Sequence, residues 1–118
     1  MTRFTTLSSK GITATLQSGR RHRSRSLLAF VDALSNESSE GPDSLLAKIA
    51  FIAPKRLGNA ELRNRCKRLL RAGMTLALEN ARVRVICDNN NIILMANPKT
   101  VEADSSQIAE EIISILEK

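Results

Sequence analysis

The residues with the clearest chemistry are seven cations gathered in the short segment 55–71, KRLGNAELRNRCKRLLR. They are Lys55, Arg56, Arg63, Arg65, Lys67, Arg68 and Arg71. The segment contains one acid, Glu61, so its net charge of +6 equals that of the whole 118-residue chain. Because each phosphate that a cation neutralises releases condensed counterions, a concentration of charge of this kind favours binding to a nucleic acid.

Residues that could catalyse a reaction are scarce. His22 is the only histidine, and it lies in a basic loop, 20–25, without a neighbouring acid or nucleophile to complete a catalytic group. Cys66 and Cys87 lack the spacing of metal ligands, and Cys66 falls among apolar positions, which favours a buried thiol. The sequence therefore predicts a protein that binds through charge and contributes no catalytic residue, and it leaves open whether the protein has a metal site.

A helix that begins after Asn59 would display these cations. Asn59 is a favoured N-cap, and Gly58 lets the chain turn into the helix. From 60 to 71 the residues are mostly good helix formers, Gly73 predicts a stop or bend, and 74–78 could add another turn. At about 100° per residue, the apolar side chains share one face, opposite most of the cations. The apolar face holds Leu62, Cys66, Leu69 and Leu70, and the other holds Arg63, Asn64, Lys67, Arg68 and Arg71, with Arg65 near the edge.

An ordinary solvated helix face is the alternative interpretation of this pattern. Such faces usually mix charges, since opposite charges four residues apart support a helix. Here like charges repel one another, so an anionic partner is favoured over solvation alone. The four arginines of 20–25, RRHRSR, would form either a flexible solvated turn or a second contact with phosphate.

The basic segment resembles the protein component of bacterial ribonuclease P. The resemblance centres on the signature Arg63-Asn64-Arg65. It extends in order and spacing to Lys55, Arg56, Gly58, Asn59, Lys67, Arg68 and Arg71. Upstream, Leu7, Gly19 and 20–23 are similar to the first helix of that family and the basic turn after it. Downstream, 92–98 and 105–117 are similar to its last core strand and closing helix.

The resemblance implies a subunit of ribonuclease P that binds the catalytic RNA and the 5′ leader of precursor tRNA and assists removal of the leader. It also implies that the RNA subunit is the catalyst and uses Mg²⁺, while the protein has no catalytic residue. The implied RNA-binding residues are Lys55, Arg56, Asn59, Arg63, Asn64, Arg65, Lys67, Arg68, Arg71, Arg20, Arg21 and Arg23. The implied leader cleft, between the first helix and the sheet, contains Ile12, Leu16 and Phe30, with Ile12 where the family usually has an aromatic residue.

The remaining pattern predicts one domain, 1–118, with an α/β (α+β) two-layer sandwich built on a small mixed sheet. The first expected elements are a helix at 6–18 with Leu7, Ile12 and Leu16 inward, and two strands at 26–34 and 46–53 around a flexible loop at 35–44. After the helix that carries the cations, we expect a strand or extended connection at 81–87, a turn at 88–91 and a strand at 92–96. A helix capped by Ser105 or Ser106 follows. In the last helix Ile108, Ile112, Ile113 (or Ile115) and Leu116 would face inward, and Glu110, Glu111 and Glu117 outward. The resemblance further implies a left-handed crossover between parallel strands, against the usual right-handed rule.

Composition sets further bounds. There is no tryptophan or tyrosine and there are three phenylalanines, so several bases could not stack on an aromatic platform. The segment 102–118 carries five acids and one lysine, and we expect it to lie away from RNA. No apolar run reaches membrane-spanning length and no signal-peptide pattern is visible, so a cytoplasmic location is expected.

Two other functions fit parts of the pattern. A helix-turn-helix DNA regulator could use 60–71 as its recognition helix, but 46–53 has the pattern of a strand where the preceding helix would be needed. A general basic RNA-binding protein, ribosomal or chaperone-like, would bind RNA without any effect on precursor cleavage. Composition and pattern leave the oligomeric state open.

Overall fold

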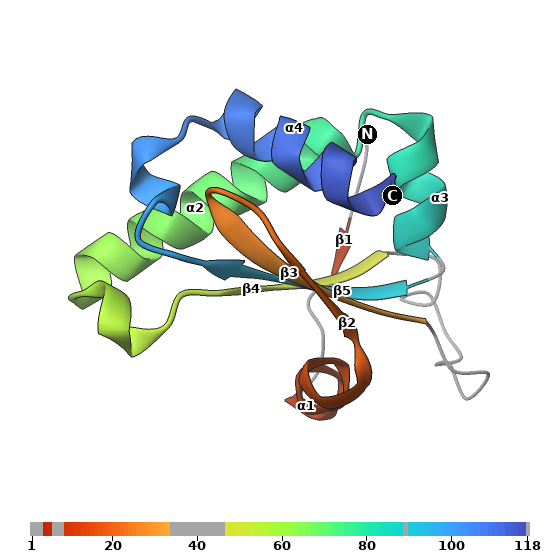
Figure 1. Cartoon of the computed structure of the whole chain (residues 1–118), viewed down its shortest axis with the longest axis horizontal. Coiled ribbons are helices and arrows are strands. Elements are labelled where there is room, and N and C mark those ends of the chain that lie inside the picture. Colours follow the sequence, from red (N-terminus) through yellow and green to blue (C-terminus); the bar gives the residue numbers. More distant parts are fainter. Residues whose placement is uncertain (1–3, 6–8, 34–46, 89, 118) are drawn as a thin grey trace.

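The computed structural model describes residues 4–5, 9–33, 47–88 and 90–117, so the expected loop at 35–44 and Leu7 lie outside the described residues. In this part of the chain, five strands form one mixed sheet with helices on both faces (Figure 1). The strands are β1 (Phe4–Thr5), β2 (Arg20–Arg23), β3 (Leu27–Ala33), β4 (Ala47–Ile52) and β5 (Asn90–Ala96). The α-helices are α1 (Ser9–Ser18), α2 (Ala60–Ala77), α3 (Ala81–Asp88) and α4 (Ser105–Leu116), with short 3-10 turns η2 (Lys55–Leu57) and η3 (Thr100–Glu102).

The strand β5 lies at the centre of the sheet, whose order is β1-β4-β5-β3-β2. It pairs parallel with β4 and antiparallel with β3, while β1 and β2 form the two edges. A strand covered on both faces needs apolar residues at successive positions, and Ile92–Ala96 supplies them. The strand begins earlier than expected, because Asn90 and Asn91 pair with β3 instead of forming a turn. The chain passes from β4 to the parallel β5 through α2 and α3, the crossover for which the family resemblance implies a left hand.

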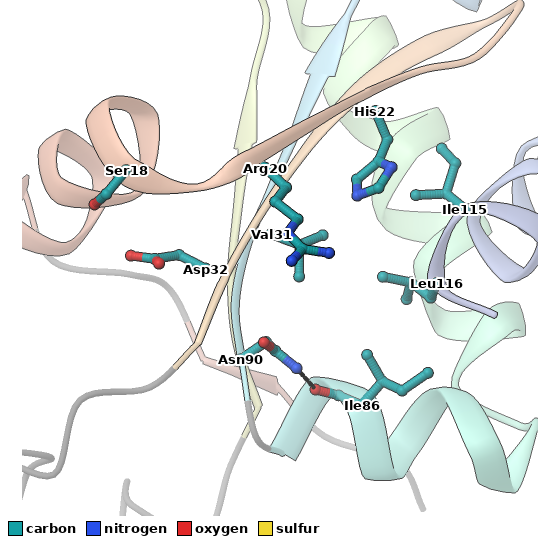
Figure 2. A pocket seen from close by; sticks show the side chains of 9 residues that line it. All are labelled: Ser18, Arg20, His22, Val31, Asp32, Ile86, Asn90, Ile115 and Leu116. Carbon is teal, nitrogen blue, oxygen red and sulfur yellow. Dashed lines mark hydrogen bonds between the residues drawn. The ribbon is translucent and has the colours of Figure 1, made fainter. Parts of the chain in front are cut away.

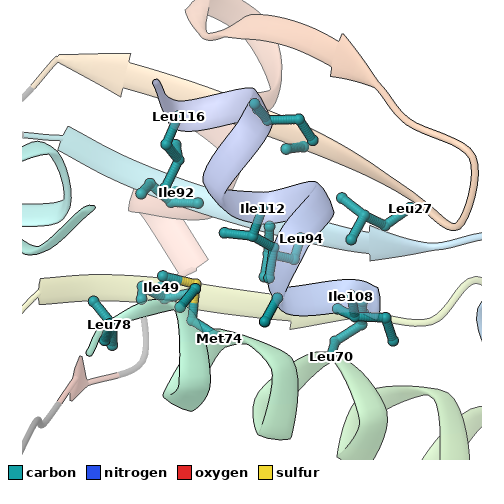
Figure 3. Packing of buried hydrophobic residues seen from close by; sticks show 14 of the residues in the cluster. Leu27, Ile49, Leu70, Met74, Leu78, Ile92, Leu94, Ile108, Ile112 and Leu116 are labelled. Atoms are coloured by element: carbon teal, nitrogen blue, oxygen red, sulfur yellow. The ribbon is translucent and has the colours of Figure 1, made fainter. Parts of the chain in front are cut away.

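The main core lies between the sheet and the helices α2, α3 and α4 (Figure 3). Its fully buried side chains include Leu27, Ile49, Ile92 and Leu94 from the strands and Leu70, Met74, Ile108 and Ile112 from the helices. A smaller cluster on the opposite face joins Ala50 and Ile93 to Ile12 of α1, with Phe30 and Ile52. The expected two-layer core is confirmed, and α1 adds a partial layer on the other side (Figure 1).

The helix α2 begins as predicted but does not stop at Gly73. The side-chain oxygen of Asn59 accepts a hydrogen bond from the Leu62 amide at 2.9 Å, which confirms the N-cap. The helix then continues through Gly73 to Ala77. Gly73 is buried, and a Cβ placed there would lie 2.4 Å from Cγ2 of Ile108. The glycine therefore marks the point where α4 crosses α2 closely, not a helix end.

The segment 81–87 is a helix, so the predicted strand is wrong. The Asn80 side-chain oxygen accepts a hydrogen bond from the Arg82 amide at 2.9 Å and starts α3. Val83 and Cys87, four residues apart, are fully buried, whereas Val85 is 61% exposed. The apparent alternation at 83, 85 and 87 was therefore misleading, because the structure uses only the i,i+4 pair for packing.

Two smaller expectations are also corrected. Asp104 caps α4 by accepting a hydrogen bond from the Gln107 amide at 2.8 Å, in place of Ser105 or Ser106. The basic segment after Gly19 is not a flexible turn, since residues 20–23 pair with β3 as the edge strand β2. His22 therefore lies on a strand rather than in a loop. In α4 the inward side chains are Ile108, Ile112, Ile115 and Leu116, and Ile113 packs against the core from a half-buried position.

We expect Gly73→Ala to destabilise the protein. Alanine favours helix over glycine by about 1 kcal/mol, but the added Cβ overlaps Ile108, and overpacking of this kind costs about 1–3 kcal/mol. The measurement is urea unfolding of the variant and the parent protein. Ala72→Gly, at the exposed neighbouring position, is the control and should lose about 1 kcal/mol from helix propensity alone. A more stable Gly73→Ala would contradict the close helix crossing.

Candidate nucleic-acid interface

The cations of segment 55–71, which we call the signature segment, lie along η2 and the first part of α2. The buried stripe of α2 comprises Cys66, Leu70, Gly73, Met74 and Ala77, and it faces α4 and the sheet. The remaining helix surface carries the polar side chains. Lys55, Arg56, Asn59, Asn64, Arg65, Arg68 and Arg71 are exposed, while Arg63 and Lys67 are half-buried. The expected cationic surface therefore exists, with Glu61 as the only acid between 55 and 71.

Two arginines of this surface have particular surroundings. The guanidinium of Arg71 lies 5.5 Å from the ring centroid of Phe51 on β4, a cation–π contact that restrains the side chain. The Nε atom of Arg63 is buried and has no hydrogen-bond partner among the described residues. A buried donor without an acceptor is costly, so a bound oxygen beside Arg63 would be favourable.

The strand β2 divides the basic run 20–23 between the two faces of the sheet. Arg21 pairs with Phe30 and Arg23 with Leu28, and directly paired residues project on the same side of a sheet. Arg21 and Arg23 therefore face the side that carries α1. By the same register, Arg20 and His22 face the side that carries α4.

The tertiary structure joins three basic segments around one hollow of about 380 Å³ at the carboxyl end of β5. Its charged lining residues are Arg23 at the end of β2, Arg25 in the turn after β2, Arg56 of η2, and Lys99 after β5. The other lining residues are Ser24, Leu28, Met95, Ala96, Asn97 and Pro98. Sequence patterns did not single out Lys99, because an isolated lysine after Asn97-Pro98 carries no signal until the turn at 23–26 is placed beside it.

A polar network fixes the walls of this hollow, which we call the basic hollow. Glu111 accepts hydrogen bonds from the Ser24 hydroxyl and, at 2.8 Å, from the Ser26 amide. Gln107 donates to the other Glu111 oxygen at 3.2 Å. Glu111 was expected to face outward, and the structure corrects this. Its carboxylate instead accepts hydrogen bonds from the turn between β2 and β3, because α4 packs close to this turn.

The segment after β5 is tied to the same turn. The Thr100 hydroxyl is fully buried and donates to the Ser26 carbonyl at 2.6 Å. The Asn97 amide group donates to the Arg25 carbonyl at 3.2 Å, and the Asn97 backbone amide donates to Thr100 Oγ1 at 3.0 Å. Arg25 and Lys99 therefore project from two loops that are hydrogen-bonded to each other.

The expected leader-cleft residues lie on α1 and the sheet face beneath it. Ile12 and Phe30 pack against the cluster of Ala50 and Ile93, so the structure brings these two together. Leu16, one turn further along α1, is 37% exposed, which corrects its expected inward position. Between them Thr15 is fully buried, and its hydroxyl donates a hydrogen bond to the Gly11 carbonyl at 2.7 Å.

A second hollow, of about 390 Å³, lies on the opposite side of the sheet (Figure 2). Arg20, His22 and Asp32 line it from the sheet, and Ile115 and Leu116 line it from α4. Its mixed charges contrast with the basic hollow, where no acid is found among the described lining residues. We therefore place the strongest anion-binding potential at the basic hollow and along α2.

Both cysteines are buried, as predicted for Cys66. Burial raises the pKa of the Cys66 thiol, and the nearby Arg65 only partly opposes this effect. Within residues 4–5, 9–33, 47–88 and 90–117, no three His, Cys, Asp or Glu side chains lie together as metal ligands would. No helix among these residues is long and apolar enough to cross a membrane.

The fold is that of bacterial RNase P proteins. The RNase P protein of Staphylococcus aureus has 18% identity, a TM-score of 0.67, and an alignment covering 95% of this chain and 92% of that one. The RNase P protein from Thermotoga maritima has 16% identity, a TM-score of 0.64, and an alignment covering 89% and 87% of the two chains. At such low identity these likenesses show the fold alone.

The sequence itself matches the Ribonuclease P family over residues 2–118, so the chain belongs to this family. The comparison with curated proteins found no match. Membership makes the protein part of an RNA-processing endoribonuclease and gives it an RNA partner within a ribonucleoprotein. The family resemblance noted for Arg63-Asn64-Arg65 is thereby confirmed.

We expect the Glu111 network to make stability depend on pH. Burial alone would raise the pKa of Glu111, but the hydrogen bonds from Ser24, Ser26 and Gln107 together hold it below the ordinary value. The stabilisation is therefore present above the ordinary glutamate pKa and lost as the pH falls through the lowered one. Glu111→Ala should cost about 1–3 kcal/mol at neutral pH, because it leaves the buried Ser26 amide without its acceptor.

Urea unfolding between about pH 3 and pH 7 would measure this dependence, since the range spans the titration of a glutamate. Glu110→Ala, on the exposed side of α4, is the matched control and should keep the parent pH dependence. Equal pH dependence in Glu111→Ala and the parent protein would show that the network contributes nothing to acid stability.

Proposed function

We propose that the chain is the RNA-binding protein subunit of ribonuclease P and assists removal of the 5′ leader from precursor tRNA. The observation that carries the proposal is the exposed row of cations on η2 and α2, on the fold and in the family of RNase P proteins. This surface would bind the catalytic RNA by neutralising its phosphates. The cleavage reaction itself would belong to the RNA subunit.

The side chains of segment 55–71 support this assignment of roles to the RNA and the protein. The signature surface offers guanidinium and ammonium groups, which are donors without a base or nucleophile among them. Their contribution would be electrostatic, because cations between two RNA strands reduce the repulsion of the phosphates. The Mg²⁺ used by the RNA subunit could then be lower in concentration for the same activity. The sheet face near Ile12 and Phe30, with Leu16, would contact the single-stranded leader through apolar side chains.

A helix-turn-helix regulator does not fit the structure. Residues 47–52 form β4 in the middle of the sheet, so the helix that such a motif requires before its recognition helix is absent there. A general RNA-binding role remains as the outcome that the cleavage experiment would have to exclude.

The decisive experiment is cleavage of a precursor tRNA at low magnesium by the RNA subunit of the same organism, with and without this protein. We expect a strong gain in correct 5′ cleavage when the protein is added. At high magnesium the gain should shrink, because metal ions then screen the phosphates without help. RNA binding without any gain at low magnesium would make the protein a general RNA-binding protein.

The contribution of α2 can be measured through the salt dependence of RNA binding. Replacing both Arg65 and Arg68 by alanine should weaken binding to the RNA subunit and flatten the salt slope by about 2 units, at about 0.9 for each lost phosphate contact. Arg82→Ala with Arg84→Ala removes two exposed charges from α3 and is the matched control. An unchanged slope in the first pair would remove Arg65 and Arg68 from the interface.

A further inference from the structure

We propose that the basic hollow binds one unpaired nucleotide of the ribonuclease P RNA subunit. This inference rests on the proposed function, since it assigns a specific site to the RNA partner. It concerns residues outside segment 55–71: Arg25 of the basic run 20–25, and Met95 and Lys99, which the sequence did not indicate as RNA contacts. The hollow has the size, charge and floor that a single nucleotide requires.

The charge of the hollow suits a phosphate. Arg23, Arg25, Arg56 and Lys99 border it from three different parts of the chain, and all four are exposed. Four cations placed together repel one another, so their arrangement is favourable mainly when an anion neutralises them. Guanidinium groups bind phosphate oxygens in pairs of hydrogen bonds, which adds orientation to the attraction.

The floor of the hollow suits a base. Leu28 and Met95 are direct partners in the pairing of β3 with β5, and both are half-buried. A planar base lying over them would remove their remaining apolar surface from water. A thioether also makes favourable contacts with aromatic rings, and arginine planes can stack on bases where aromatic side chains are lacking. Phosphate alone would leave this floor uncovered.

The nucleotide must be unpaired to reach the floor. In a double helix the bases are stacked inside, and a protein reads the backbone and shape instead. A volume of about 380 Å³ lies within the range of small-ligand pockets, so it admits one nucleotide and not a helix.

The walls are held in place before RNA arrives. Asn97 and Thr100 hydrogen-bond to the Arg25 and Ser26 carbonyls, and Glu111 holds the same turn from the side of α4. Because the backbone of both walls is fixed, little conformational entropy is lost when the site is filled. The acid of this network is occupied by hydrogen bonds and does not line the hollow.

Continuity of the surface assigns the nucleotide to the RNA subunit. Arg56 borders the hollow and also begins the basic segment that continues along α2. An RNA docked on α2 therefore meets the hollow without leaving the same interface. The apolar contact proposed for the leader lies further along the same sheet face, beneath α1 at Ile12 and Phe30.

The chemistry can be tested on the protein alone with methyl NMR. Methionine methyl groups would be ¹³C-labelled and a short oligouridylate added. We expect the Met95 signal to shift, while Met74, fully buried in the core, stays unchanged as an internal control. Inorganic triphosphate should shift Met95 much less, because it has no base to cover the floor. Binding of the oligouridylate without any change at Met95 would overturn the site.

The assignment to the RNA subunit can be tested with a double variant, Arg25→Ala with Lys99→Ala. Affinity for the RNA subunit should fall at least about tenfold, as expected for lost charge-assisted hydrogen bonds. The salt slope should decrease by about 1.4 units, at about 0.7 per phosphate of a single strand. Arg82→Ala with Arg84→Ala removes the same charge from α3, beyond the opposite end of β5, and should have a smaller effect.

Glu102→Gln provides a test of opposite sign. Glu102 lines a small depression that adjoins the basic hollow and shares Arg25 and Lys99 with it. Removal of its charge should tighten binding of the RNA subunit. Weaker binding by this variant would contradict an anion site beside Glu102. Equal losses from the two double variants would mean that only the total charge matters. Either result would overturn a specific site.

The outcomes also separate this inference from the proposed function. If the double variant binds the RNA subunit normally but loses affinity for leader-bearing precursor tRNA, the assignment to the RNA subunit is wrong. If the parent protein promotes low-magnesium cleavage and the double variant behaves like the parent throughout, the site alone is wrong. If oligouridylate shifts Met95 but the parent protein gives no gain in cleavage, the proposed function alone is wrong.

Discussion

The structure depends on the burial of β5 on both faces of the sheet. Alternate residues of this strand, Ile92 and Leu94, pack under α2 and α4, while Ile93 packs toward α1. A strand that is covered on both faces has to be apolar at successive positions. In this sheet the neighbours of β5 are β3 on one side and β4 on the other. The position of β5 also decides where the chain emerges at Asn97, beside the turn that follows β2.

The basic surface is assembled around that point from segments that are distant in sequence. Arg23 comes from the end of β2 and Arg25 from the turn between β2 and β3, whereas Arg56 belongs to the connection between β4 and α2, and Lys99 to the segment after β5. Thr100 and Asn97 donate hydrogen bonds that hold the loops together, and Glu111 accepts one from the same turn. In this way the protein presents a shaped group of cations rather than a diffuse charge.

Much of the fold could be predicted, because the apolar pattern of the strands is local. The strands at 27–33 and 47–52 and the helix capped by Asn59 were found where the sequence indicated them. The prediction was wrong where one sequence pattern is compatible with two kinds of secondary structure. Residues 81–87 alternate like a strand, but the Asn80 cap and the burial of Val83 with Cys87 make them a helix.

Gly73 is a single residue whose role could not be predicted from local sequence. Glycine is common at helix ends, and the sequence alone could not reveal that Ile108 of a distant helix would lie against it. Glu111 was expected to face outward because an acid on a helix surface is usually solvated, and this prediction was also wrong. The turn at 24–26, distant in sequence, supplied hydrogen-bond donors that helical periodicity cannot indicate.

By itself the sequence determined the family, the sign of the charge and the helix that displays it. These follow from the types and spacing of neighbouring residues, which are short-range properties. The tertiary structure alone decided which cations meet, because Arg25, Arg56 and Lys99 come together only through the pairing of β3 and β4 with β5. Charge at one point in space depends on contacts between distant segments, and such contacts form only when the core folds.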